Sequence, residues 1–261
     1  MKVNKSALRA IDILNLVSES EDPMTIAKIS SSLDIPKSST FELVYALVNR
    51  NYLEIDDEKI KTFKLGIKIF EVGVAYLKNT DLHHESRPIL DNLMVESGET
   101  VFLVVEDRGN LVYLDKVEGY SNVRTTAALG SRNPMHCTGV GKALLASYSD
   151  NRVSEIVESK GFAPKTEYSL KNYDDLIKDL GEIRKRGFSI DDRESELEVF
   201  CLAAPIYDSS KKAIAAISIA TLYSKMDDER LEKFSNLVTN AALIISRKLG
   251  FIEDKLYFDF K

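Results

Sequence analysis

Residues 24–65 read MTIAKISSSLDIPKSSTFELVYALVNRNYLEIDDEKIKTFKL, and their apolar residues recur first at the spacing of a helix and later at that of a strand. Thr25 can cap a helix that carries its apolar face inward, and Asp34-Ile35-Pro36 breaks that helix. Ser38 or Ser39 can cap the helix that follows. The segment therefore predicts two helices joined by a tight turn.

A hairpin is predicted directly after these two helices. Residues 52–55 and 61–65 have the pattern of short strands, with a charged tip between them. An amphipathic helix over residues 6–19 precedes the pair. Its apolar stripe is formed by Leu8, Ile11, Leu14 and Val17, widened by Ile13 and Leu16. Residues 1–65 therefore predict a winged helix-turn-helix, which places its second helix in the major groove of DNA and its hairpin on the phosphates.

The charge of the chain gives this prediction only local support. Net charge is −6, and residues 1–78 carry equal numbers of basic and acidic side chains, so the acidic excess lies after them. This balance argues against a general polyanion binder, although a local cluster of cations can still contact phosphates. One such cluster is formed by Lys59, Lys61, Lys64 and Lys68, and a solvated loop would show the same pattern.

The candidate DNA contacts lie in the two helices and on the hairpin. Residues at the start of a recognition helix contact base edges, and hairpin lysines contact phosphates. The candidates are Thr25, Lys37, Ser38, Ser39, Thr40, Phe41 and Glu42 in the helices, and Lys61 and Lys64 on the hairpin.

Two helices are predicted to follow the hairpin. Residues 66–80 form a linker helix whose apolar residues lie on more than one face. Such a helix is usually covered on several sides, by its own domain or by a second subunit, so we expect a dimer contact here. Residues 81–97 form an amphipathic helix that ends at Gly98.

From Thr100 onward the pattern changes to strands. Residues 100–106 and 110–118 predict two strands joined by the hairpin turn Asp107-Arg108-Gly109. A glycine-rich turn then leads into a helix between Cys137 and Tyr148. Further strands are predicted over 122–127, 199–207 and 212–222, and further helices over 151–159, 172–186 and 227–249. This interleaving predicts an α+β fold, with one central antiparallel sheet over 81–252 and a C-terminal tail over 253–261.

Composition is that of a globular protein, with 44% hydrophobic and 29% charged residues in a chain of 261. Cys137 and Cys201 are far apart and lack metal-type spacing, so a disulfide framework is not expected. No stretch approaches the roughly 20 apolar residues of a membrane span, and the N-terminus lacks a signal peptide's apolar core. We therefore expect a cytoplasmic protein without a membrane partner.

Several short strings follow one another in a specific order and spacing. In the N-terminal part they are residues 6–14 (SALRAIDIL), 36–39 (PKSS), 52–53 (YL) and 63–66 (FKLG). In the C-terminal part they are residues 98–101 (GETV), 112–118 (VYLDKVE), 134–145 (PMHCTGVGKALL) and 201–206 (CLAAPI). Together they resemble the IclR family of bacterial transcription regulators over nearly the whole chain.

The resemblance implies a winged helix-turn-helix joined by a helix to a GAF-like sensor domain, in dimers that often pair into tetramers. It also implies control of a catabolic operon by a small organic acid. The positions that match the family's ligand contacts are Gly139, Asp191, Cys201 and Ser218. Backbone N–H groups at Gly139 could hold a carboxylate, Ser218 can donate a hydrogen bond, and Asp191 suits a substrate hydroxyl. Cys201 is a small, polarizable wall residue. Without the resemblance, Gly139 would be a turn glycine and Cys201 a core residue.

Three positions depart from the family pattern. Glu198 stands where a glycine is usual, Ala220 where a second serine is frequent, and Glu42 where a basic residue is usual. Phe200 is expected to reshape the pocket, so the identity of the effector stays open. Glu42 would repel phosphate, although its carboxylate could accept from cytosine N4.

Two other classes of function compete with this one. His136, Cys137, Cys201 and Asp191 could form a Cys/His nucleophile pair or a zinc site. No group orients a base, so catalysis is not expected. No metal site and no cofactor is predicted, and a structural zinc in the C-terminal part stays an open alternative. A metabolite-binding protein with lost or altered DNA binding is the alternative that Glu42 supports. The main hypothesis is a ligand-controlled regulator, in which a repressor is favoured and the effector is a small organic or sugar acid. Its partners are operator DNA and further copies of the chain.

Overall fold

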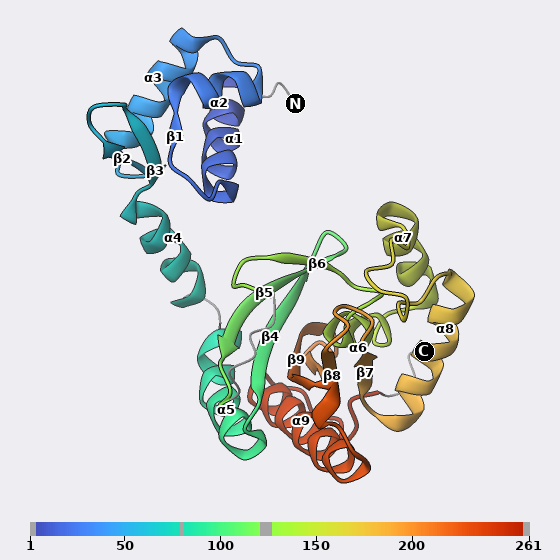
Figure 1. Ribbon diagram of the computed structural model, residues 1–261. Helices are drawn as coiled ribbons and strands as arrows, with labels where there is room; N and C mark the ends of the chain where they lie inside the picture. The colour runs from blue at the N-terminus through green and yellow to red at the C-terminus, as the bar shows by residue number, and fades with distance from the viewer. Residues whose placement is uncertain (1–3, 79–80, 121–126, 258–261) are drawn as a thin grey trace. The chain divides into compact units, whose positions relative to one another are not determined.

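The computed structural model describes residues 4–78, 81–120 and 127–257 (Figure 1). The chain divides into two compact units, residues 1–80 and residues 81–261. Each unit has its own hydrophobic core, and each is described separately below.

The N-terminal unit is a winged helix-turn-helix, as the sequence predicts. Its helices are α1 (Lys5–Glu19), α2 (Ile26–Leu33), α3 (Lys37–Val48) and α4 (Ile67–Lys78), and its strands are β1 (Met24–Thr25), β2 (Leu53–Asp57) and β3 (Thr62–Leu65). The strands form a small antiparallel sheet in the order β1-β3-β2. The short strand β1 was not predicted, because two residues are too few to show an alternating pattern.

Local chemistry explains most boundaries of these helices. The Thr25 hydroxyl accepts from the backbone N–H of Lys28 at 3.2 Å, which confirms the predicted cap of α2. Asp34 adopts a left-handed backbone, with φ of 50°, and ends the helix. The predicted cap of α3 was wrong. The helix begins at Lys37 after Pro36, whose fixed φ suits a helix entrance, so Ser38 and Ser39 lie inside its first turn.

The buried face of α1 differs from the predicted stripe. Ile13 and Val17 lie in the core, whereas Leu8 and Ile11 are 47% and 54% exposed. The period of the helix was right, but two overlapping apolar stripes compete, and only contacts made by distant residues decide between them.

The C-terminal unit has three layers, with one antiparallel sheet in the middle (Figure 1). Within the described residues the strand order is β6-β5-β4-β9-β8-β7. The strands are β4 (Thr100–Asp107), β5 (Asn110–Val117), β6 (Arg132–Pro134), β7 (Ser189–Asp192), β8 (Val199–Tyr207) and β9 (Ala213–Leu222). The helices are α5 (Asp81–Ser97), α6 (Gly139–Leu145), α7 (Asp150–Lys160), α8 (Tyr173–Arg186) and α9 (Asp228–Lys248), with a 3-10 turn at Tyr223–Lys225.

Along each strand, successive side chains point to opposite faces of this sheet and pack into two separate hydrophobic cores. Phe200 and Leu202 of β8 pack on the side of α5 and α9, whereas Val199, Cys201 and Ala203 pack on the side of α6 and α8. The expectation that Phe200 reshapes the pocket was therefore wrong. A neighbour of Cys201 along a strand must point to the opposite face of the sheet.

Several other sequence predictions can be compared with this unit. The turn Asp107-Arg108-Gly109 is confirmed, with positive φ at Arg108 and Gly109. Most of the strand predicted over 122–127 lies outside the described residues, and strands β6 and β7 were not predicted. The segment taken as a tail begins in contact with the core, because Leu256 is buried and the Tyr257 hydroxyl donates to the Ala143 carbonyl at 3.2 Å.

Candidate functional site

Helix α3 presents a mixed polar and apolar surface to solvent. Lys37, Ser38, Phe41 and Glu42 are exposed, and Ser39 is half-buried. Phe41 is 51% exposed and its ring lies 4.5 Å from that of Tyr45. A surface with one cation, one anion and an aromatic ring suits apolar and hydrogen-bonding contacts to base edges.

Thr40 was wrongly included among the predicted DNA contacts. Its side chain is fully buried, and its hydroxyl donates to the backbone carbonyls of Ile35, at 3.4 Å, and Pro36, at 3.2 Å. Both acceptors lie in the tight turn between α2 and α3. Thr40 therefore holds the turn and cannot reach DNA without unfolding it.

The hairpin lysines are paired with nearby carboxylates. Lys61 pairs with Glu58, and Lys64 pairs with Asp56 at 2.8 Å and Glu54 at 3.4 Å. Four carboxylates and three lysines lie between residues 54 and 64. The structure thus shows that the lysine cluster, the main electrostatic support for a DNA-binding wing, is locally balanced by acids.

The C-terminal unit contains a small cavity between the sheet and α6. Its described lining is Phe102, Tyr113, Ala127, Thr138, Gly139, Val140, Asp191, Ser195, Glu196, Val199, Cys201, Ser218 and Ala220, around a volume of about 30 Å³. All four effector positions expected from the sequence are present in this lining. Strand pairing explains this, since Asp191 is paired with Cys201, and Ala203 with Ser218, on neighbouring strands.

Gly139 allows helix α6 to approach the sheet closely. A Cβ atom at this position would lie 3.2 Å from the Cys201 sulfur and 3.5 Å from the Asp191 Cβ. The Ser189 hydroxyl donates to the Gly139 carbonyl from the strand beneath. Gly139 is thus both a close-packing residue and part of the cavity wall, and a methyl group there would occupy space in the cavity.

The Asp191 carboxylate is already hydrogen-bonded to the loop that follows it. Its carboxylate accepts from the backbone N–H groups of Glu194, at 2.7 Å, and Ser195, at 3.2 Å, and from the Ser195 hydroxyl at 2.6 Å. Burial raises the pKa of Asp191, and the bonds from Ser195 oppose that rise. Asp191 therefore shapes the 191–196 loop in addition to facing the cavity.

The apolar part of the cavity was missed by the sequence analysis. Phe102 and Tyr113 meet edge to face with ring centroids 5.3 Å apart, and the Tyr113 hydroxyl accepts from the Asn133 amide at 3.3 Å. Burial raises the pKa of Tyr113 to about 12, so its hydroxyl stays protonated. Alternation within the predicted strands places both rings on the cavity face, and this was the available signal.

The cysteines do not have the environment of nucleophiles. Burial raises the pKa values of Cys137 and Cys201 to about 12, so both remain thiols. His136 is buried with its ring edge against Phe162, and burial lowers its pKa. Among the described residues, no group of three or more His, Cys, Asp or Glu side chains is arranged to hold a metal ion.

Known protein families match both units of the chain. The IclR helix-turn-helix domain matches residues 6–57, and the C-terminal domain of the bacterial transcriptional regulator IclR matches residues 74–247. The HTH-type transcriptional repressor AllR of Escherichia coli is 34% identical over 242 residues, which cover 93% of this chain and 89% of AllR.

The chain belongs to the IclR family.

Two solved structures of this family align with nearly the whole chain. The Thermotoga maritima IclR has a TM-score of 0.80 and 28% identity, covering 94% of this chain and 99% of its own. An IclR homologue from Microbacterium hydrocarbonoxydans, solved with 4-hydroxybenzoate, has a TM-score of 0.83 and 19% identity, covering 94% and 99%. The protein is therefore a DNA-binding transcription regulator with an effector-binding domain, and not an enzyme.

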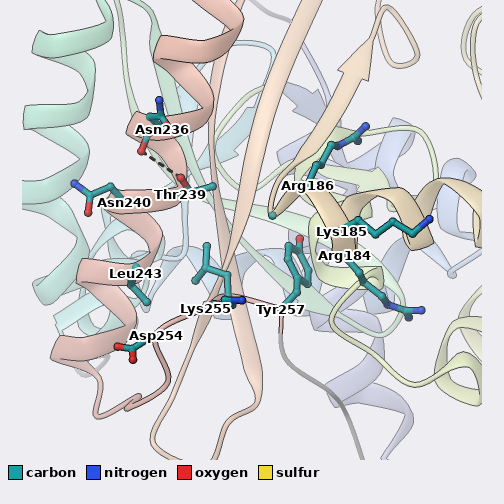
Figure 2. Close-up of a pocket in the computed structure, with 12 residues that line it drawn as sticks. Arg184, Lys185, Arg186, Asn236, Thr239, Asn240, Leu243, Asp254, Lys255 and Tyr257 are labelled. Atoms are coloured by element: carbon teal, nitrogen blue, oxygen red, sulfur yellow. Dashed lines mark hydrogen bonds between the residues drawn. The ribbon is translucent and has the colours of Figure 1, made fainter.

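A larger depression lies elsewhere on the C-terminal unit of this IclR-family regulator. It measures about 650 Å³ and lies between the end of α8, one face of α9 and residues 254–257 (Figure 2). Its arginines already have partners, since Arg184 donates to the Ala146 carbonyl at 2.9 Å and Arg186 to that of Phe188 at 2.7 Å. The smaller cavity, with its convergent polar groups, is the better candidate for the effector.

Among the helices that the structure describes, none has both the length and the apolar character that a membrane span requires.

Proposed function

We propose that this protein is an effector-controlled repressor of a catabolic operon, and that a small organic or sugar acid binds in the cavity beneath α6. The observation that carries the proposal is the convergence of Gly139, Asp191, Cys201 and Ser218 on one cavity. The repressor AllR supports the sign of regulation, and the 4-hydroxybenzoate bound to the Microbacterium homologue supports an acid as ligand. Such a regulator acts where the chromosome is, in the bacterial cytoplasm.

Exposed apolar side chains in the N-terminal unit support a dimer or tetramer. On α1, Leu8 and Ile11 are about half exposed, and on α4, Ile67, Phe70 and Tyr76 are 62%, 67% and 58% exposed. A soluble protein rarely leaves several large apolar side chains of two helices open to water. A second copy of the chain would cover them and would place two recognition helices about 34 Å apart, on successive major grooves.

The size of the cavity favours a small ligand. Its volume of about 30 Å³ is only about twice the roughly 10–15 Å³ that a cavity needs to hold one water molecule. An acid of a few heavy atoms requires a modest separation of the walls, and a large aromatic acid would require much more. Ser218 is a hydroxyl donor on the sheet side, and the half-buried Ser195 and Glu196 form part of the remaining wall.

A metabolite-binding protein with altered DNA binding is the second candidate. The balanced charge of residues 54–64 and the exposed carboxylate of Glu42 favour it, because both weaken attraction to phosphates. A gel-shift titration with the DNA upstream of the protein's own gene separates the two functions. If the protein is a repressor, the DNA should form a retarded complex that dissociates when a small carboxylic acid is added. The alternative function gives no complex, with or without the acid.

Gly139→Ala links that effect to the cavity. The added methyl group meets the Cys201 sulfur at 3.2 Å, so the variant should bind the DNA normally and lose its response to the acid. Gly181→Ala is the matched control, since nothing lies within 4 Å of its added methyl group, and it should respond like the parent protein. An acid response retained by Gly139→Ala would place the effector elsewhere.

A further inference from the structure

A buried cluster of charges lies directly behind the effector cavity. The Lys142 ammonium on α6 is 2% exposed and is shared by Asp179 of α8, at 2.8 Å, and Glu194 of the loop after β7. Asp191 completes the cluster, because its carboxylate accepts from the Glu194 backbone N–H at 2.7 Å. One buried ammonium thus lies among three carboxylates, of which Asp191 and Glu194 are buried and Asp179 is partly exposed.

This cluster is continuous with the cavity wall. Asp191 lines the cavity, and so do Ser195 and Glu196 of the same loop. The Glu194 backbone is held from the other side, where its carbonyl accepts from the Ser169 hydroxyl at 2.6 Å. A change of charge in the cavity can therefore act on Glu194 through Asp191 and the loop that both residues share.

The groups that face Glu194 leave it short of positive charge. Helix α6 contributes Lys142, β7 contributes Asp191, and α8 contributes Asp179, whose second oxygen lies 3.7 Å from the Arg186 guanidinium. On its own loop, the Arg193 guanidinium is turned to Asp192. The Glu194 Oε2 atom is buried and has no hydrogen-bond partner among the described residues. Burial, with Asp191 and Asp179 nearby, raises the pKa of Glu194 to about 7 despite the adjacent Lys142.

An acid in the cavity would add a further negative charge to this group. Among the described lining residues no side chain is a lysine or an arginine, while two are carboxylates. A nearby like charge favours the protonated form of a carboxyl group, and the effect is strong where water is excluded. The buried carboxyl that has an unpaired oxygen is the group best placed to accept a proton.

We propose that the effector cavity takes up a small monocarboxylate together with one proton, which Glu194 holds on its Oε2 atom. The proton comes from solution, and no covalent bond is made or broken. The inference rests on the proposed function, because it needs an acid in this cavity. It also predicts selectivity, since a dicarboxylate would bring a second charge for which the cluster has no second unpaired oxygen.

Isothermal titration calorimetry of the full chain tests this coupling, with acetate, glycolate and lactate as monocarboxylate probes and oxalate as the dianion. Titrations are run at about pH 6 in phosphate, and at about pH 8 both in phosphate and in Tris, whose ionisation heats differ. For the parent protein, the dissociation constant should rise by up to about tenfold across this range, because one more proton is bound per ligand at the higher pH. The heat at the higher pH should depend on the buffer, and oxalate should bind more weakly than glycolate.

Glu194→Gln should remove the coupling, because the amide is neutral at every pH. Its dissociation constant should be the same at both pH values, and its binding heat should not depend on the buffer. Glu198→Gln is the matched control on the same loop, where the side chain is exposed, and it should behave like the parent.

The outcomes separate the two proposals. Binding to the parent protein without pH dependence or proton uptake overturns the proton coupling and leaves the acid-responsive cavity intact. Failure of all four acids to bind at either pH overturns both. The parent's buffer dependence needs no variant, so the test holds even if Glu194→Gln does not fold.

Discussion

Lys142 and Lys64 each pair with two carboxylates, but in different surroundings. Lys142 is 2% exposed in the core of the C-terminal unit, whereas Lys64 is 48% exposed on the hairpin of the N-terminal unit. Water screens the pairs of Lys64 and competes for its ammonium, so a phosphate can replace a carboxylate there. The Lys142 ammonium is shielded from water, so its loss leaves the buried Glu194 without a cation. Burial thus makes one lysine part of the fold and leaves the other free to exchange partners.

Replacing each lysine with methionine should give very different losses of stability. Lys142→Met leaves the buried Glu194 without a cation and leaves Asp179 with only the more distant Arg186, which should cost about 3–5 kcal/mol in the free energy of unfolding. Lys64→Met should leave the melting temperature nearly unchanged, because its carboxylates are solvated. Thermal unfolding followed by circular dichroism measures both. A mild effect of Lys142→Met would mean that the cluster is more hydrated than its burial indicates.

The pH dependence of stability should expose the same contrast. The pKa of Glu194 is raised to about 7 in the folded protein, against an ordinary value of 4.5. At low pH both states are protonated, and between about pH 4.5 and 7 the unfolded chain loses a proton that the folded protein keeps. Unfolding therefore becomes easier over that window, by up to about 3 kcal/mol, and does not change further above it.

Urea unfolding at about pH 5 and about pH 8 checks this effect. The parent protein should lose stability relative to Glu194→Gln as pH rises, whereas Glu58→Gln, which removes an exposed partner of Lys61, should run parallel to the parent. Parallel curves for the parent and Glu194→Gln would show that Glu194 is ionised throughout.

The contrast also explains what the sequence could predict. Alternation along residues 199–207 and 212–222 determines which side chains of each strand share a face. Cys201 and Ser218 were assigned to one site by the family resemblance, and the register of β8 on β9 places them on the same face of the sheet. The Lys142 cluster could not be predicted in this way, because its partners lie 37 and 52 residues away and nothing local marks them as partners. Thr40 was misplaced for a related reason, since its burial depends on the path of the turn before α3.

The recognition helix offers a third test, of moderate size. Glu42 is exposed on α3, and its carboxylate opposes any approach to phosphates. Glu42→Arg should strengthen binding to random-sequence duplex DNA several-fold at low salt, and should steepen the dependence of the logarithm of affinity on that of salt concentration by about one. Fluorescence anisotropy across a salt series measures both. If neither changes, Glu42 does not face the duplex.

The smallest expected effect separates the two kinds of exposed lysine. Lys37 is the first residue of α3 and has no ion-pair partner among the described residues, whereas Lys64 is paired with Asp56 and Glu54. Lys37→Ala should therefore weaken binding to random DNA more than Lys64→Ala, since only Lys64 must first give up existing pairs. Anisotropy at one low salt concentration is sufficient to rank them. Equal losses would mean that the hairpin's acids do not compete with DNA, and the wing would then contact phosphates as fully as its lysine content alone indicates.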